Sequence, residues 1–160
     1  MQLIVADTSP LVYLVLIEHI GILPRLFETV LVPDAVHTEL RNPLAPAPVQ
    51  AWTAALPSWV EVKQTPNVPD DAALRPLGAG ERAAIVLALS IHADLVLIDE
   101  RKGTQVAIDK GLHVAGTLGI LPRAARHGLL DLAEAFDRLK RTNFRYRQEI
   151  MDKLSETGRH

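Results

Sequence analysis

Short apolar runs alternate with helical patterns along most of the chain, and this alternation limits the possible folds more than any other feature. The run Leu3–Ala6 is typical of a buried strand, and a polar turn and an apolar helical pattern follow it directly. The same order of strand and then helix recurs after Val30–Val32 and after Leu95–Ile98. Strands that are separated by helices predict an α/β fold of three layers, α/β/α, around a mostly parallel central sheet.

Turn and capping residues set the bounds that we expect for the elements. Besides the runs above, we expect strands at Trp59–Lys63 and Leu112–Ala115. Ser9 is the expected N-cap of the first helix, with Pro10 at its first position, and Asp34 is the expected cap of the helix that ends at Leu40. The expected helices are Leu11–His19, Pro24–Phe27, 33–40, Val49–Leu56, Gly80–His92, Arg101–Lys110, Thr117–His127, Leu130–Lys140 and Arg145–Leu154.

Length and composition are those of one globular domain. The chain has 160 residues, of which 48% are hydrophobic, enough to bury a core without covalent cross-links. We expect a single domain over 1–154 and a frayed tail over 155–160. The proline-rich stretch 43–48 is expected to be a loop, and 64–79 a surface loop with a short helix.

The same composition bears on the location of the protein. No cysteine is present, which excludes disulfides and thiolate metal sites and fits a cytoplasmic location. The first residues do not have the pattern of a signal peptide, because Asp7 interrupts the apolar run early. The apolar stretch Leu11–Ile17 is too short to span a bilayer, so we expect no membrane association.

Four acidic side chains stand where predicted strands and helices meet. Asp7 and Asp99 each follow a buried strand, and open α/β sheets bind their ligands at the carboxyl ends of strands. Glu39 lies near the end of the helix at 33–40, and Glu81 lies in the first turn of the helix that begins at Gly80. Two carboxylates about 5 Å apart repel each other by roughly 3 kcal/mol at an effective dielectric of ~20. A cluster of this kind persists when a divalent cation occupies it, as in a metal-dependent phosphodiesterase.

Each of these acids also has a purely structural interpretation. Asp7 and Asp99 stand where aspartate commonly begins a helix. The helix dipole stabilises an acid at the position of Glu81 by about 0.3 to 1 kcal/mol. Glu39 fits the structural interpretation less well, because the dipole disfavours an acid near the end of a helix.

Together the four acids match the pattern of a known family. The string Asp7-Thr8-Ser9 after the first strand resembles the opening of PIN-domain ribonucleases, which include the toxin subunits of VapBC-type toxin–antitoxin pairs. The segments 32–40 and 78–85 resemble the second and third acidic motifs of that family, and Leu97–Glu100 is similar to the fourth. The later stretch Gly116–Leu121 resembles a branch of uncharacterised PIN-like proteins. The resemblance covers nearly the whole chain and implies a PIN-like fold.

The activity that the resemblance implies is hydrolysis of RNA phosphodiester bonds by a divalent-metal ribonuclease. Mg²⁺ or Mn²⁺ is the implied cofactor, in agreement with a set of oxygen ligands and the lack of a zinc motif. Asp7 and Asp99 would hold one ion, directly or through water. Glu81 and Glu39 would complete its shell, hold a second ion or accept a proton from the attacking water.

Three further residues are expected to support the acids. Thr8 and Ser9 carry hydroxyls that could orient a metal-bound water or the Asp7 carboxylate. Glu100 stands where the family pattern leads us to expect a second aspartate, so a carboxylate is kept there and could substitute for Asp99 or assist it. The segment after Glu100 lacks an arginine that the same pattern leads us to expect, which weakens the expected contact with a substrate phosphate.

The resemblance also implies partners: an RNA substrate, a cognate antitoxin protein and a second copy of the chain in a homodimer. The net charge of −2 is not typical of a nucleic-acid-binding protein. The segment Arg138–Arg147, however, holds five basic residues and no acid, and predicts a local patch for phosphates or for an acidic partner. A solvated helix face is the alternative for that segment. The apolar residues 11–17 of the first helix are expected to leave apolar surface for a dimer.

Other folds with acids at strand ends fit less well. A response-regulator receiver needs two adjacent acids near the first strand, and a haloacid-dehalogenase-type phosphatase needs an aspartate at position 9, which is Ser9. A dinucleotide-binding domain needs a glycine-rich first turn. The remaining alternative to a ribonuclease is a catalytically silent PIN-like module that binds nucleic acid or an antitoxin.

Overall fold

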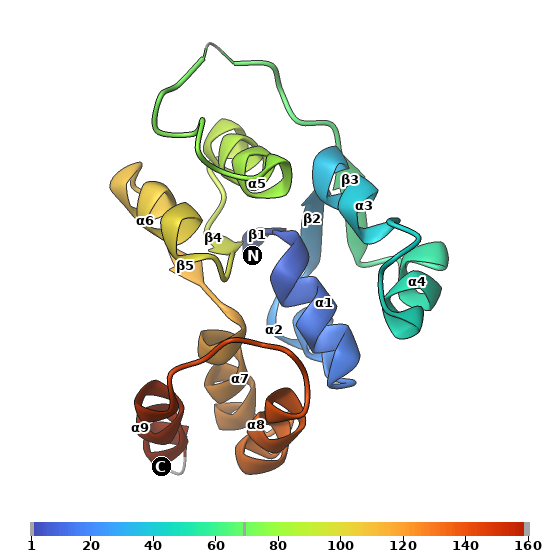
Figure 1. Cartoon of the computed structure of the whole chain (residues 1–160), viewed down its shortest axis with the longest axis vertical. Coiled ribbons are helices and arrows are strands. Elements are labelled where there is room, and N and C mark those ends of the chain that lie inside the picture. The colour runs from blue at the N-terminus through green and yellow to red at the C-terminus, as the bar shows by residue number, and fades with distance from the viewer. Residues whose placement is uncertain (1, 69, 159–160) are drawn as a thin grey trace.

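The computed structural model describes residues 2–68 and 70–158, and Figure 1 shows its elements along the chain. The strands are β1 (Leu3–Ala6), β2 (Thr29–Pro33), β3 (Val60–Lys63), β4 (Leu95–Leu97) and β5 (Val114–Ala115). The helices are α1 (Thr8–Leu16), α2 (Leu23–Leu26), α3 (Asp34–Leu40), α4 (Ala47–Ala54), α5 (Ala79–Ile91), α6 (Arg101–Asp109), α7 (Thr117–Arg126), α8 (Leu132–Lys140) and α9 (Gln148–Gly158), with a short 3₁₀ helix η1 (Ile20–Ile22).

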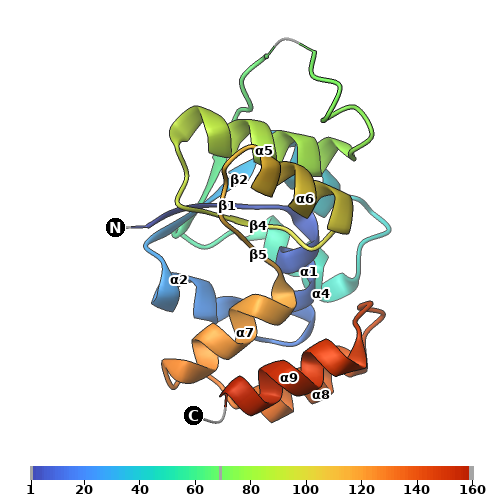
Figure 2. The same ribbon diagram turned by 90° about the vertical axis from the view of Figure 1, so that its left-hand side faces the viewer.

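The strands form one sheet in the order β3-β2-β1-β4-β5, and every neighbouring pair is parallel. Figure 2 shows α5 and α6 on one face of this sheet and α2, α7, α8 and α9 on the other. The predicted three-layer α/β/α arrangement is therefore confirmed. Because all strands run the same way, their carboxyl ends meet at one edge of the sheet.

Side chains of the central strands alternate between the two faces and are buried on both. Val5 and Val96 pack with residues of α5 in one apolar cluster. Ile4 and Leu97 belong to the larger cluster on the opposite face, which includes residues of α1, α7 and α8. This period of two with both faces covered explains why the strands read as continuous apolar runs.

The predicted N-cap of the first helix is wrong by two residues. Asp7 has extended backbone angles, φ −82° and ψ 171°, and is the N-cap of α1, so Pro10 is the third helical residue. The Ser9 hydroxyl does not cap the helix, because it donates a hydrogen bond to the Asp99 carboxylate at 2.8 Å.

Two other helix starts also differ from the prediction. Pro33, and not Asp34, is the N-cap of α3, and the Asp34 carboxylate accepts a hydrogen bond from the Thr65 hydroxyl at 2.8 Å. The predicted loop 43–48 is shorter than expected, because α4 begins at Ala47. Proline is tolerated in the first turn of a helix, where no intrahelical partner exists for an N–H.

The loop and tail predictions need correction as well. Among the described residues of 64–78 there is no helix, and turns are confined to 72–76, where the Asp71 carboxylate accepts a hydrogen bond from the Ala73 amide. Helix α9 continues to Gly158, so the segment from 155 onward begins as helix. The Ser155 hydroxyl donates to the Met151 carbonyl at 3.0 Å within it. Residues 159–160 of the predicted tail lie outside the described residues.

The apolar first helix leaves less free surface than its sequence predicts. Leu11 and Leu14 are fully buried in the larger core cluster, and Val12 and Leu16 pack against it. Most of the apolar surface of this helix is therefore covered, while Val12 and Leu16 stay partly exposed. Within the described chain no single helix has the length and apolar content to cross a membrane, and only α1 combined with 20–26, bent by 115°, meets those criteria as a pair.

Candidate active site

The carboxyl ends of β1 and β4 bring two aspartates to the same edge of the sheet. The Asp7 amide donates to the Leu97 carbonyl at 2.9 Å, which extends the pairing of these strands by one residue. Asp7 is buried, with 4% of its surface exposed. Its Oδ1 has no hydrogen-bond partner among the described residues, so a buried carboxylate oxygen is left without a donor from them.

Asp99 is held by donors on three sides. Its Oδ1 accepts from the Thr117 amide at 2.6 Å, and its Oδ2 accepts from the hydroxyls of Thr117 and Ser9, both at 2.8 Å. A Cβ at Gly116 would lie 2.7 Å from Asp99 Oδ1. The absence of a side chain at Gly116 is therefore what lets the carboxylate reach the first turn of α7.

Glu39 reaches the site from α3, which follows β2. One carboxylate oxygen accepts from the Thr8 hydroxyl at 2.5 Å, and the other accepts from the Gly80 amide at 2.8 Å. A Cβ at Gly80 would lie 2.6 Å from a Glu39 carboxylate oxygen, so only glycine gives this carboxylate room. Glu39 thus connects α1 to the start of α5.

Glu81 and Glu100 form a second group of acids at the starts of α5 and α6. Glu81 is the third residue of α5, and its Oε1 accepts from the Gly78 amide at 3.3 Å. Glu100 is the N-cap of α6 and accepts from the Gly103 amide at 2.9 Å. Glu81 Oε2 is buried without a partner. The N-cap of α6 is therefore Glu100, and the interpretation of Asp99 as that cap is wrong.

All of these acids face one cavity of about 570 Å³. The predicted residues that line it are Asp7, Thr8, Ser9, Glu39, Glu81, Asp99 and Glu100. The predicted orientation of the Asp7 carboxylate by these hydroxyls is wrong, since Thr8 donates to Glu39 and Ser9 donates to Asp99. The side chains meet because their elements all end or begin at the carboxyl edge of the sheet.

Burial and mutual repulsion favour the protonated form of these acids. Burial raises the pKa of Asp7 to about 7, the Thr8 amide opposes the rise, and the charges of the neighbouring acids add to it. Burial also raises the pKa of Asp99, against the opposing donors of Thr117 and Ser9. The pKa of Glu81 is raised by burial and then by the neighbouring Glu100 carboxyl group. A cation in the cavity would reverse these shifts.

The donor set fits a hard divalent cation. Every acid offers oxygen, which Mg²⁺ and Mn²⁺ prefer, and the unpaired oxygens of Asp7 and Glu81 face no competing donor. Within 2–68 and 70–158, no three Asp, Glu, His or Cys side chains stand as a ready-made metal-binding group. The carboxylates of Glu39 and Asp99 are instead turned toward amide and hydroxyl donors. An ionised carboxylate has about four acceptor sites, so these bonds leave lone pairs for a cation.

Sequence reasoning missed several residues of the cavity. Thr117 is not among the lining residues but bonds Asp99 across a sequence separation of 18 residues, and its only signal in the sequence is its place in the stretch Gly116–Leu121. Tyr13, Asn143 and Phe144 also line the cavity, and none of them was a candidate. Arg145 lines it too, and the only signal for it was its place in the basic segment Arg138–Arg147.

Comparison with known proteins gives one positive finding. A family model described as a PIN domain matches residues 3–158, which is nearly the whole chain. No curated protein and no solved structure matches.

Proposed function

The chain belongs to the PIN-domain family, and from that premise we propose that it is a divalent-metal-dependent endoribonuclease. The observation that carries the proposal is the gathering of the carboxylates around one cavity in which Asp7 Oδ1 has no donor. A buried carboxylate without a donor is unfavourable unless it takes up a proton or meets a cation. PIN domains are generally nucleases, and an acid-lined cavity at a sheet edge suits their chemistry.

Asp7 and Asp99 are the proposed principal ligands of Mg²⁺ or Mn²⁺, and Glu81 and Glu39 complete the set. A bound ion would lower the pKa of a water molecule and offset negative charge on the phosphate. The Ser9 hydroxyl orients the Asp99 carboxylate toward the cavity.

A side chain of the protein can also act as a general base in this site. Burial and the neighbouring Glu100 raise the pKa of Glu81 in the metal-free protein, so Glu81 takes up a proton more readily than an exposed glutamate does. Glu81 would accept the proton from the attacking water at its unpaired Oε2, and Glu100 would share that proton. The Glu39 carboxylate accepts hydrogen bonds from the Thr8 hydroxyl and the Gly80 amide, so it is not the proposed proton acceptor.

The experiment that tests this proposal is RNA cleavage by the purified full chain. Single-stranded and structured RNA would be incubated with Mg²⁺, with Mn²⁺ and with a chelator, using the parent protein and the Glu39→Gln and Glu81→Gln variants. We expect cleavage that requires the metal, that the chelator abolishes, and that both variants lose without unfolding. Cleavage that survives the chelator, or that both variants retain, would contradict the proposal.

One observation favours a second candidate function. The acids are not arranged as a ready-made metal-binding group within the described residues, as expected of a PIN-like module that binds nucleic acid without cutting it. The same assay separates the two functions. A parent protein that binds RNA with either metal but leaves it intact would establish the silent module.

The resemblance to VapBC-type toxins supports a finer proposal, in which the chain is the toxin of a toxin–antitoxin pair. Expression of the chain alone would then stop growth, and co-expression of a small protein encoded beside it would restore growth. We also propose a homodimer, by analogy with that family. Light scattering measures the mass directly, and a monomer at micromolar concentration would contradict the dimer.

A further inference from the structure

The segment that joins α8 to α9, residues 141–147, forms part of the wall of the acidic cavity. Asn143, Phe144 and Arg145 line the cavity together with the carboxylates. Figure 2 shows this connection at the end of the molecule where α1 begins, which is the carboxyl edge of the sheet. The segment is remote in sequence from every acid of the site, so its presence there is a product of tertiary packing.

Tyr13 holds this segment in place. Its hydroxyl donates to Asn143 Oδ1 at 2.8 Å, and its ring meets the Phe144 ring edge to face, with centroids 4.9 Å apart. Tyr13 lies one helical turn after Ser9 on α1, and the Ser9 hydroxyl bonds Asp99. The segment and the acids are therefore positioned by the same face of one helix.

Most charges of the predicted basic patch are already engaged. Arg138 forms ion pairs with Glu134 and Glu18, Arg141 pairs with Asp137, and Arg147 lies 4.0 Å from Glu149. The segment 138–147 therefore does not form a general phosphate-binding surface.

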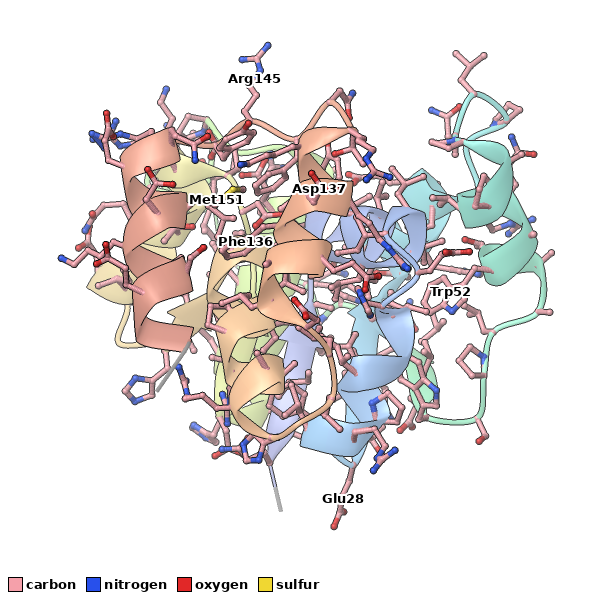
Figure 3. All side chains as sticks on the ribbon, turned by 90° about the horizontal axis from the view of Figure 1, so that it is seen from below. Glu28, Trp52, Phe136, Asp137, Arg145 and Met151 are labelled. Carbon is pink, nitrogen blue, oxygen red and sulfur yellow. The ribbon has the colours of Figure 1, made fainter. Side chains whose placement is uncertain are left out.

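Arg145 differs from these neighbours. It is exposed and makes no ion pair with any described residue. Figure 3 shows it projecting away from the chain, at the opposite end of the molecule from Glu28, which precedes β2 at the amino edge of the sheet. Among the described residues that line the cavity, Arg145 is the cation and five are acids.

We infer that Arg145 is a substrate-binding residue whose guanidinium contacts a phosphate of RNA beside the acidic cavity. The inference rests on the proposed ribonuclease function and deepens it. Carboxylates repel a phosphodiester, and a guanidinium at the rim offers paired N–H donors of the geometry that phosphate accepts. Tyr13 acts as a positioning residue, because its contacts with Asn143 and Phe144 set where Arg145 stands.

Binding of a labelled single-stranded RNA tests the inference, with fluorescence anisotropy read at several salt concentrations. All proteins carry Asp7→Asn so that the RNA stays intact. We expect Arg145→Ala to weaken binding about tenfold and to reduce the slope of log Kd against log salt by about 0.7, the value for one phosphate of a single strand. Arg145→Lys should keep that slope, because it keeps the charge.

Two further variants separate a direct contact from a structural effect. Arg141→Ala removes another exposed arginine, which is paired with Asp137, and should change neither affinity nor slope. Tyr13→Phe removes only the hydroxyl that bonds Asn143, and should weaken binding while leaving the slope in place.

The possible failures are distinguishable. If the Asp7→Asn protein binds RNA and adding Arg145→Ala changes neither affinity nor slope, the inference about Arg145 is overturned while the proposed function stands. If that protein binds no RNA and the parent cleaves none, the proposed function fails and the inference fails with it.

Discussion

The carboxyl ends of β1 and β4 are neighbours in the sheet and each carries an aspartate, buried at Asp7 and half-buried at Asp99, yet the two ends are built differently. At the end of β4, Asp99 is surrounded by the amide and hydroxyl of Thr117 and the hydroxyl of Ser9. At the end of β1, Asp7 has an oxygen that accepts from no donor in the described part of the chain. The comparison teaches that the protein supplies the partners of one carboxylate and leaves the other for a proton or a cation.

The largest expected effect is the loss of RNA cleavage when either aspartate is replaced, and the loss should be similar for Asp7 and Asp99. Asp7→Asn and Asp99→Asn should each lower metal-dependent RNA cleavage by about 10²- to 10⁴-fold, because a bound ion supplies several kcal/mol of charge stabilisation and each 1.36 kcal/mol is tenfold in rate. Single-turnover cleavage measures this loss. Asp131→Asn is the matched control, since Asp131 caps α8 outside the cavity. Full activity in either strand-end variant would show that its carboxylate is not a ligand.

The free energy of unfolding should respond differently to pH at the two strand ends, because of the two aspartates only Asp7 has an oxygen without a donor among the described residues. The pKa of Asp7 is raised in the folded chain to about 7 from an ordinary value of 3.8. Between these values the folded state binds more protons than the unfolded state, so stability is full below pH 3.8 and is lost as pH rises to about 7. Asp7→Asn removes this loss, which corresponds to about 4 kcal/mol, and should stabilise the metal-free protein at pH 8.

Urea unfolding at pH 4.5 and pH 8, with a chelator, measures this difference. The gain from Asp7→Asn should be far smaller at pH 4.5, and Mg²⁺ at pH 8 should stabilise the parent more than the variant. Equal stability of parent and variant at pH 8 would show that the buried carboxylate carries no such penalty.

The donors around Asp99 should have a measurable energy of their own. Thr117→Val removes one hydroxyl donor to the half-buried Asp99 carboxylate, and hydrogen bonds to charged groups contribute about 1.5 to 3 kcal/mol. Thr53→Val is the matched control, because the buried Thr53 hydroxyl donates to the neutral Val49 carbonyl, and neutral bonds contribute about 0.5 to 1.5 kcal/mol. Denaturant unfolding should rank Thr117→Val as the more destabilising change. The reverse order would mean that Asp99 does not depend on its donors.

The smallest expected effect is at Gly80, next to Glu39. Gly80→Ala places a Cβ 2.6 Å from a carboxylate oxygen at the tip of a flexible side chain, so Glu39 can move away at little cost to the fold. We expect metal affinity to fall about tenfold, as is typical when the support of a ligand is disturbed, with unfolding free energy nearly unchanged. Unchanged metal affinity would indicate that the orientation of Glu39 does not matter.

The sequence predicts one part of this site well because that part follows from chain direction alone. Asp7 and Asp99 follow apolar runs, and parallel strands necessarily deliver their ends to one edge. Glu39 and Glu81 required the family resemblance as well, since each also fits an ordinary helix position. The order β3-β2-β1-β4-β5, which makes the two aspartates neighbours, is not visible in any local pattern.

The rest of the site depends on contacts between distant segments. Ser9 looks like a helix cap in sequence, but its hydroxyl is taken by Asp99, 90 positions away. The position of Arg145 follows from Tyr13 packing against Phe144, 131 residues later. Likewise, five basic residues within ten positions predict a patch, while ion pairs with neighbouring acids neutralise three of the five.

Manganese binding at pH 7, followed by electron paramagnetic resonance and by calorimetry in two buffers of different ionisation enthalpy, tests the central claim most directly. The account predicts saturable binding by the parent protein that releases protons, because Asp7 must give up its proton to become a ligand, and at least tenfold weaker binding by Asp7→Asn. Binding that is absent in the parent, or equally tight in Asp7→Asn, would contradict it.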